Sequence, residues 1–184
     1  VLESELPSQF DALTQAAVEV GGRQLQNAGA VGGNLCNAAP AADGVMYSDM
    51  PRARVAETVR QTHAALAEKG RSADGYRISN IWAWHVKADR QVALTEARRE
   101  LLLRGLLDRW YLESFLSPED CEFVEKHKSA FFKAYRSRDG VIEGVPESLV
   151  HTLLDNFTIT GTPDELEGRK SELLAFQAAG VHEI

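Results

Sequence analysis

The sequence is poor in cysteine, with only Cys36 and Cys121 among its 184 residues. Two cysteines cannot form a disulfide framework, and they have no metal-binding spacing, so we expect no metal site and a reducing compartment. No apolar stretch approaches the roughly 18 residues of a membrane span. The N-terminus also lacks the basic segment and apolar run of a secretory signal. These absences predict a cytoplasmic protein that does not contact a membrane.

Positive charge is also scarce, with 20 basic against 27 acidic side chains and a formal net charge of -7. Proteins bind nucleic acids through clustered Lys and Arg that neutralise phosphates, so this balance argues against a nucleic-acid partner. The remaining composition, 44% hydrophobic and 26% charged, is close to the globular average. It excludes a disordered or collagen-like chain and leaves room for about one ordinary domain.

The charge distribution changes near Asp43. Residues 1–43 contain five acids and one base, whereas residues 44–184 contain the other 22 acids and 19 bases. Such a change in charge density is typical of a module boundary. We therefore expect two modules, 1–43 and 44–184.

Hydrophobic spacing and helix-start signals predict a helix-rich α/β chain with parallel strand pairing. In the helix over 89–112, the spacing turns Val92 and Leu106, among others, towards the core. The other expected helices cover about 10–20, 52–69, 118–136, 146–156 and 163–180, and the expected strands cover 77–86 and 157–160, with a further strand beginning at 181–184.

The run from Gln24 to Asp43 is the most distinctive local pattern. Gly29, Gly32 and Gly33 would let backbone N–H groups approach an anion without an intervening side chain. The spacing matches neither the dinucleotide-binding G-x-G-x-x-G pattern nor a phosphate-binding P-loop. On composition alone, a flexible surface turn is the alternative interpretation.

This run closely resembles the second flavin-binding stretch of the FAD-binding domain in molybdenum hydroxylases, the family of the xanthine dehydrogenase and carbon monoxide dehydrogenase medium subunits. Gln26 and Ala30 depart from that family's usual Arg and Thr or Ser. The family's other diphosphate-binding loop is absent. The resemblance implies FAD-binding roles for Ala30, Val31, Gly32, Gly33, Asn34 and Asp43.

From Ala42 onward a second resemblance covers about 140 residues. The segments 42–51, 78–86, 104–112 and 161–163 resemble the C-terminal half of luciferase-like oxidoreductases. These are (β/α)8 barrels that use FMN or the deazaflavin coenzyme. Together the two resemblances imply a fusion: part of a (β/α)8 barrel preceded by a short FAD-binding-domain fragment.

A closed barrel of this type needs around 250 residues. We therefore expect open sheet edges in this chain, covered by a second copy of the chain or by a partner chain. Because several strands of a barrel are missing, we also expect little activity from the chain by itself.

Candidate site residues lie on or near the ends of expected strands, where barrel enzymes place their chemistry. His85 is the candidate catalytic residue, as a proton donor or a hydrogen-bond partner of a cofactor; a structural histidine is the alternative. Trp82 and Trp84, two apart on one strand, could line a planar cofactor pocket or belong to the core. Tyr47, Ser48 and Asp49 could touch a substrate or cofactor or form a polar loop.

Two other patterns have simpler interpretations. Arg104, Asp108 and Arg109 have the spacing of an ion pair on a helix surface, which we favour over phosphate binding. The segment 161–163 could hold a phosphate at a helix start, although we favour a bare N-cap that needs no ligand.

Three functions remain open. The chain could be the C-terminal part of a flavin- or deazaflavin-dependent oxidoreductase or monooxygenase of the luciferase-like class, and we prefer this function because its resemblance is the longer. It could be a fragment of the FAD-binding subunit of a molybdenum hydroxylase. It could also be a non-catalytic helical α/β interaction protein.

Overall fold

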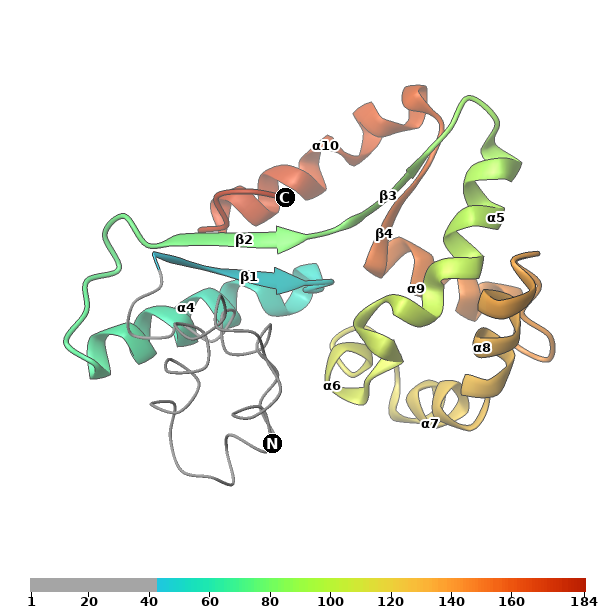
Figure 1. The fold of residues 1–184 in the computed structure, drawn as a ribbon, viewed down its shortest axis with the longest axis horizontal. Helices are drawn as coiled ribbons and strands as arrows, with labels where there is room; N and C mark the ends of the chain where they lie inside the picture. The colour runs from blue at the N-terminus through green and yellow to red at the C-terminus, as the bar shows by residue number, and fades with distance from the viewer. Residues whose placement is uncertain (1–42) are drawn as a thin grey trace, which may run out of the picture. The chain divides into compact units, whose positions relative to one another are not determined.

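The computed structural model describes residues 43–184. The helix expected over 10–20 and the glycine-containing run up to residue 42 lie outside the described residues. The elements, labelled as in Figure 1, are β1 (Gly44–Ser48), α4 (Arg52–Glu68), β2 (Arg77–Ile81), β3 (Ala83–Val86), α5 (Arg90–Glu100), the short 3-10 turns η2 (Leu101–Leu103) and η3 (Gly105–Leu107), α6 (Arg109–Leu112), α7 (Pro118–Lys126), α8 (Lys128–Ser137), α9 (Glu147–Phe157), β4 (Thr158–Gly161) and α10 (Pro163–Ala178).

The strands form two small sheets. β1 pairs with β2, and β3 pairs with β4 in parallel, with His85 opposite Thr160. The chain end adds a parallel bridge between Ser79 and Glu183, where the Asn80 N–H donates to the Glu183 carbonyl at 2.9 Å. The predicted parallel α/β pairing is therefore confirmed for β3 and β4, and the expected strand over 181–184 consists of this single bridge.

The strand predicted over 77–86 is divided at Trp82 into β2 and β3. Ile78 and Asn80 are buried in alternation along β2, but Trp82 and Ala83 are buried in succession. The alternation of the strand therefore shifts by one residue at the break. An unbroken strand with both tryptophans on one face was the wrong expectation, because aromatic and β-branched content does not reveal such a shift.

The helix predicted over 89–112 is also shorter than expected. α5 ends at Glu100, and the next residues form η2, η3 and α6. The prediction that Val92 and Leu106 face the core is wrong, since both side chains are more than half exposed. Leu106 points outward because its backbone φ is 51°, in the left-handed region where a helix cannot continue.

Most of the hydrophobic core lies in the helical segment between β3 and β4. Its fully buried members come from α5, η2, η3, α6, α7, α8 and α9 and include Ala97, Val124, Phe131, Leu153 and Phe157. The helix expected over 118–136 is divided at His127 into α7 and α8. This crossover is much longer than the single helix of a simple strand–helix–strand unit.

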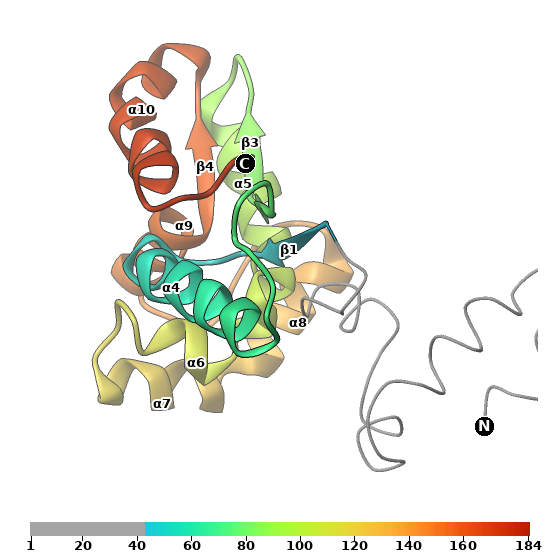
Figure 2. The same cartoon turned by 90° about the vertical axis from the view of Figure 1, so that its left-hand side faces the viewer.

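Helices α4 and α10 pack against each other beside the strands (Figures 1 and 2). Arg52 of α4 forms an ion pair with Glu172 of α10 at 3.5 Å. Phe176 of α10 meets the Trp82 ring edge-on at a centroid distance of 4.9 Å. Trp82 is therefore part of the packing between α10 and the strands.

Candidate functional site

The carboxyl end of β1 brings two of the predicted site residues next to a buried carboxylate. The Tyr47 hydroxyl forms a hydrogen bond with the Thr62 hydroxyl of α4, so Tyr47 is tied to the helix that follows its strand. Ser48 is exposed, and its hydroxyl donates to Asp49 at 2.9 Å. Asp49 is only 3% exposed and has a positive φ of 56°.

Asp49 forms an ion pair that the sequence analysis missed. Its carboxylate accepts from Arg104 Nη1 at 3.0 Å and from the Gly105 N–H at 3.1 Å. The predicted ion pair on a helix surface is wrong, because Arg104 lies beyond the end of α5. Asp108 instead caps α6 by accepting from the Trp110 N–H, and Arg109 pairs with Glu113 and Glu125.

A tyrosine completes the polar cluster at this strand end. The Tyr111 hydroxyl donates to the Ser48 carbonyl at 3.3 Å. Burial, together with the nearby carboxylates of Asp49 and Asp108, raises the pKa of Tyr111 above its ordinary value. The phenol therefore stays protonated and keeps its role as a donor.

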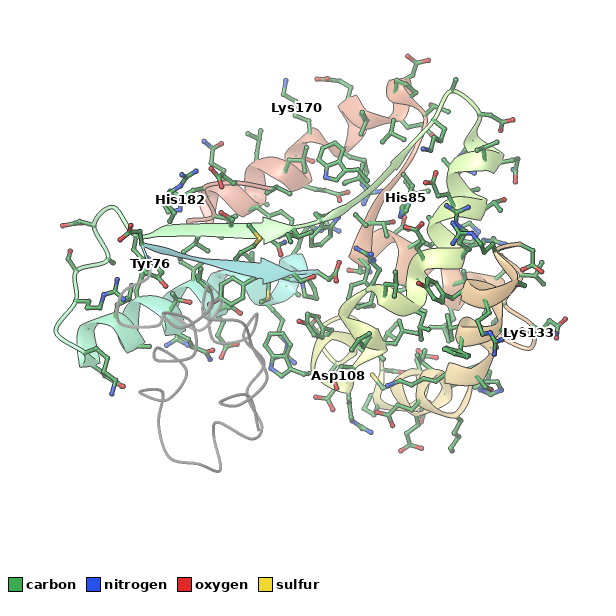
Figure 3. The ribbon with its side chains drawn as sticks, viewed as in Figure 1. Tyr76, His85, Asp108, Lys133, Lys170 and His182 are labelled. Carbon is green, nitrogen blue, oxygen red and sulfur yellow. The ribbon has the colours of Figure 1, made fainter. Side chains whose placement is uncertain are left out.

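His85 lies in β3 on the side that faces α5 (Figure 3). The side chain is buried, and neither ring nitrogen has a hydrogen-bond partner among the described residues. Its Nε2 atom lies 4.0 Å from a carboxylate oxygen of Glu100. Burial lowers the pKa of His85, while the carboxylates of Glu100 and Glu96 oppose that shift. A neutral imidazole is therefore held inside the fold, and its predicted catalytic role stays a prediction.

Trp82 and Trp84 both line an open hollow of about 340 Å³ on the strands. Trp82 is buried, whereas Trp84 is 44% exposed. Met46, Ile81 and Ile184 add exposed apolar surface to the same hollow, and Ser79, Asn80 and Glu183 add its polar groups. The hollow thus offers an aromatic face and an apolar floor to a planar ligand.

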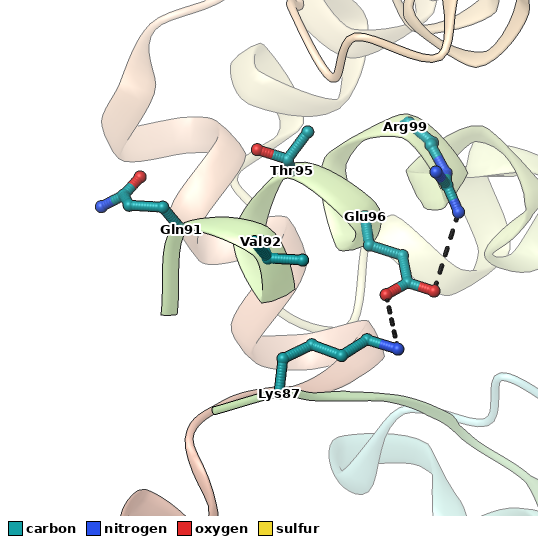
Figure 4. Close-up of a pocket in the computed structure, with 6 residues that line it drawn as sticks. All are labelled: Lys87, Gln91, Val92, Thr95, Glu96 and Arg99. Atoms are coloured by element: carbon teal, nitrogen blue, oxygen red, sulfur yellow. Dashed lines mark ion pairs between the residues drawn. The ribbon is translucent and has the colours of Figure 1, made fainter. Parts of the chain in front are cut away.

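A second hollow, of about 460 Å³, lies between the end of β3 and α5 (Figure 4). Its charged groups already neutralise one another. Lys87 Nζ lies 2.9 Å from one oxygen of Glu96, and Arg99 Nη2 lies 3.7 Å from the other. We therefore place the candidate site at the hollow with the tryptophans, where Trp84 leaves an exposed aromatic side chain available to a ligand.

The helix start at 161–163 caps itself. The Glu165 carboxylate accepts from the Thr162 N–H at 2.7 Å, forming a capping box with Thr162. An additional Cβ at Gly161 would lie 2.5 Å from that carboxylate. A phosphate here would meet a negative charge, so this end of α10 is explained as an N-cap.

The other predicted positions yield less. Ala30, Val31, Gly32, Gly33 and Asn34 lie outside the described residues, and Asp43 is exposed just before β1.

Cys121 is buried, and burial raises the pKa of its thiol. Within residues 43–184 there is no group of three or more potential metal ligands. In that same range, no helix is both long and apolar enough to cross a membrane.

Comparison with known proteins gives one family and one fold. The family model described as luciferase-like monooxygenase matches residues 14–183. The solved structure of the coenzyme F420-dependent tetrahydromethanopterin reductase from Methanopyrus kandleri is similar, with a TM-score of 0.54 and 19% sequence identity. The similarity covers 77% of this chain and 38% of that one. No curated protein matches the chain in sequence.

These comparisons give no support to the molybdenum-hydroxylase resemblance. The luciferase-like match begins at residue 14 and so extends into the segment that we had assigned to an FAD-binding-domain fragment. A fusion is therefore not needed to account for residues 14–43. The fold is a helix-rich α/β part of a luciferase-like barrel, in agreement with the second resemblance.

Proposed function

Because the chain belongs to the luciferase-like monooxygenase family, we propose that it binds the ring system of FMN or of the deazaflavin coenzyme and is part of an oxidoreductase. The observation that carries this proposal is the exposed indole of Trp84, which lines one hollow together with the apolar side chains of Ile81 and Met46. The similar archaeal reductase is described as dependent on coenzyme F420, which favours the deazaflavin as the first cofactor to test.

The described residues fit the ring of such a cofactor better than its phosphate. An exposed tryptophan beside aliphatic side chains can stack on a planar ring. Around the strand ends, Lys87, Arg99 and Arg104 are each already paired with a carboxylate. The phosphate end therefore finds no free cation among these three, and we assign only ring binding to the described part of the chain.

A bound flavin or deazaflavin would supply the hydride chemistry itself. The chain's own contribution is to place the ring and to restrict water at its face. Asn80 maintains the floor, since its side chain accepts from the Met50 N–H at 3.1 Å and donates to the Met50 carbonyl at 3.3 Å. We assign no proton transfer to His85, because its ring is buried on the side of β3 that faces α5.

The test is a binding titration of the purified chain with the deazaflavin coenzyme, FMN and FAD, followed by equilibrium dialysis. We expect one of the first two to bind, and Trp84→Ala to weaken that binding by about tenfold, since ring stacking contributes roughly 0.5–1.5 kcal/mol. The matched control is Phe132→Ala, which removes an exposed aromatic side chain on α8 and should leave the affinity unchanged.

Two outcomes would contradict the proposal. If the wild type and Trp84→Ala bind the cofactor with equal affinity, the hollow lined by Trp84 is not the binding site of the ring. Binding of FAD alone, lost in Gly33→Asp, would instead restore the first resemblance, because the new carboxylate would oppose a diphosphate at that glycine.

A further inference from the structure

The hollow lined by Trp84 also contains a charged side chain, Glu183, which the proposed function does not use. The other described residues that line this hollow are apolar, aromatic or neutral polar. The Glu183 side chain is 51% exposed, so a ligand in the hollow can reach it. Such a ligand takes water from the carboxylate, and a charge that loses water needs a hydrogen-bond donor in return. The ligand therefore has to present a donor to Glu183.

The contacts of Glu183 hold its carboxylate in place. The Asn80 N–H donates to the Glu183 carbonyl at 2.9 Å, next to the parallel bridge between Ser79 and Glu183. The Ser79 hydroxyl donates to Glu183 Oε2 at 2.9 Å, and Arg77 forms an ion pair with Oε1. Both the backbone and the carboxylate of Glu183 are thereby tied to β2. Arg77 itself is not among the residues that line the hollow.

Ser79 and Glu183 form a polar rim that presents acceptors to a ligand. An ionised carboxylate has about four acceptor positions, and its contacts with Ser79 and Arg77 leave a lone pair on each oxygen. The Ser79 hydroxyl directs its proton to Glu183, so it too can only accept from a ligand. Asn80 adds little, because its amide oxygen and nitrogen are both bonded to the Met50 backbone.

A planar ring with an N–H on its edge suits both parts of this hollow. Its face can stack on the exposed indole of Trp84, and its N–H can donate to the polar rim. The rings of flavins and deazaflavins carry such a group in their pyrimidine part, the N3–H between two carbonyl groups. A phosphate suits the rim poorly, because the Glu183 carboxylate repels it.

We infer that Glu183 is the specificity-determining residue of this hollow: it accepts a hydrogen bond from the ring N–H of the cofactor and so turns the pyrimidine edge of the ring towards the polar rim. The inference rests on the proposed function for the presence of the ring. Its own basis is the fixed carboxylate that shares the hollow with Trp84. The same carboxylate keeps the phosphate of the cofactor away from the rim.

The test compares lumiflavin, the flavin ring without a phosphate-bearing chain, with 3-methyllumiflavin, in which a methyl group replaces the N3 proton. Equilibrium dialysis measures the affinity of the purified chain and of Glu183→Gln for each compound. We expect the wild type to bind lumiflavin about tenfold more tightly, since a site built around an N–H leaves its acceptor unpaired when that proton is missing. Glu183→Gln should reduce this preference to about threefold or less, because a neutral acceptor forms a weaker hydrogen bond.

The choice of variants separates recognition of the proton from simple exclusion of the methyl group. Glutamine has nearly the size of glutamate, so a preference that comes only from lack of space would survive in Glu183→Gln. Trp84→Ala removes stacking and should weaken the binding of both compounds by the same factor. Glu143→Gln, which breaks an exposed ion pair with Lys133, is the matched control and should keep the wild-type affinities.

The outcomes distinguish this inference from the proposed function. If the wild type binds FMN or the deazaflavin coenzyme but shows no preference between the two lumiflavins, the inference is wrong and the proposed function stands. The same holds if Glu183→Gln keeps the full preference. If the wild type binds none of these compounds, the proposed function fails, and the inference fails with it.

Discussion

At the scale of single residues, His85 has an environment that makes stability depend on pH. Its imidazole is buried, and it faces the carboxylates of Glu100 and Glu96 as well as the cations Arg104 and Lys87. Burial is the largest of these influences and lowers the pKa of the ring. The folded state therefore favours neutral His85, whereas the unfolded chain binds a proton near the ordinary value of about 6.5.

We expect the free energy of unfolding to fall as the pH falls below about 6.5. A histidine with a lowered pKa contributes its full stability above the unfolded value and loses it as the unfolded state takes up more protons. Urea unfolding at about pH 7.5 and pH 5.5 measures this fall, which should be smaller in His85→Asn. His63→Asn, an exposed position on α4, is the control for loss of a histidine outside the core. A fall of the same size in His85→Asn would assign the dependence to other groups.

At the scale of elements, the turn after α5 determines where the helical segment changes direction. Gly105 stands at a positive φ, and an added Cβ would lie 2.9 Å from the ring of Tyr111. Both the backbone and the available space therefore require glycine at this position. The turn then sends the chain into α6, which packs next to α7.

Gly105→Ala should lower the free energy of unfolding by about 1–3 kcal/mol, because it combines a left-handed backbone with a steric clash. Gly168→Ala is the matched control, since no atom lies within 4 Å of its added Cβ and it sits inside α10. That change should stabilise the chain by roughly 0.5–1 kcal/mol. Urea unfolding of both variants is the measurement, and a Gly105→Ala protein as stable as the wild type would refute the assigned strain.

At the scale of the whole chain, one face of the strands exposes several large apolar side chains, where a strand face in contact with water normally carries polar ones. Met46, Ile81, Trp84 and Ile184 are each between 42% and 50% exposed around one hollow. No element among residues 46–184 covers them. Contiguous apolar patches of this kind favour association. This patch adds to the expectation, drawn from open sheet edges, that a second copy or a partner chain covers the sheet.

We expect the isolated chain to associate with itself in a concentration-dependent manner, and Ile81→Lys to reduce that association. A charge at the centre of an apolar contact loses hydration without gaining a partner. Light scattering coupled to size-exclusion chromatography measures the mass of both proteins across a range of concentrations. Val141→Lys, an exposed apolar position far from β2 in sequence, is the control. A monomeric wild type at every concentration would reject self-association.

The sequence by itself determined the elements whose signals are local. Helix α4 follows Pro51 as expected, Ser117 caps α7 by accepting from the Asp120 N–H, and Thr162 with Glu165 begins α10. Such caps satisfy N–H groups within one turn of the chain, so neighbouring residues are enough to predict them. The family was also accessible from the sequence, through the segments that resemble luciferase-like enzymes.

Only the tertiary structure decided the contacts between segments far apart in the chain. Trp82, at the break between β2 and β3, packs against Phe176 of α10. The end of α5 lies beside the turn held by Asp49, which precedes Arg104 by 55 residues. Local spacing assigned Arg104 to a helix. Helical periodicity contains no information about the carboxylate of Asp49, which lies far from Arg104 in the sequence. The burial of His85 under α5 has the same origin: a residue's own strand fixes which side its ring faces, but the element packed there determines whether the ring meets water.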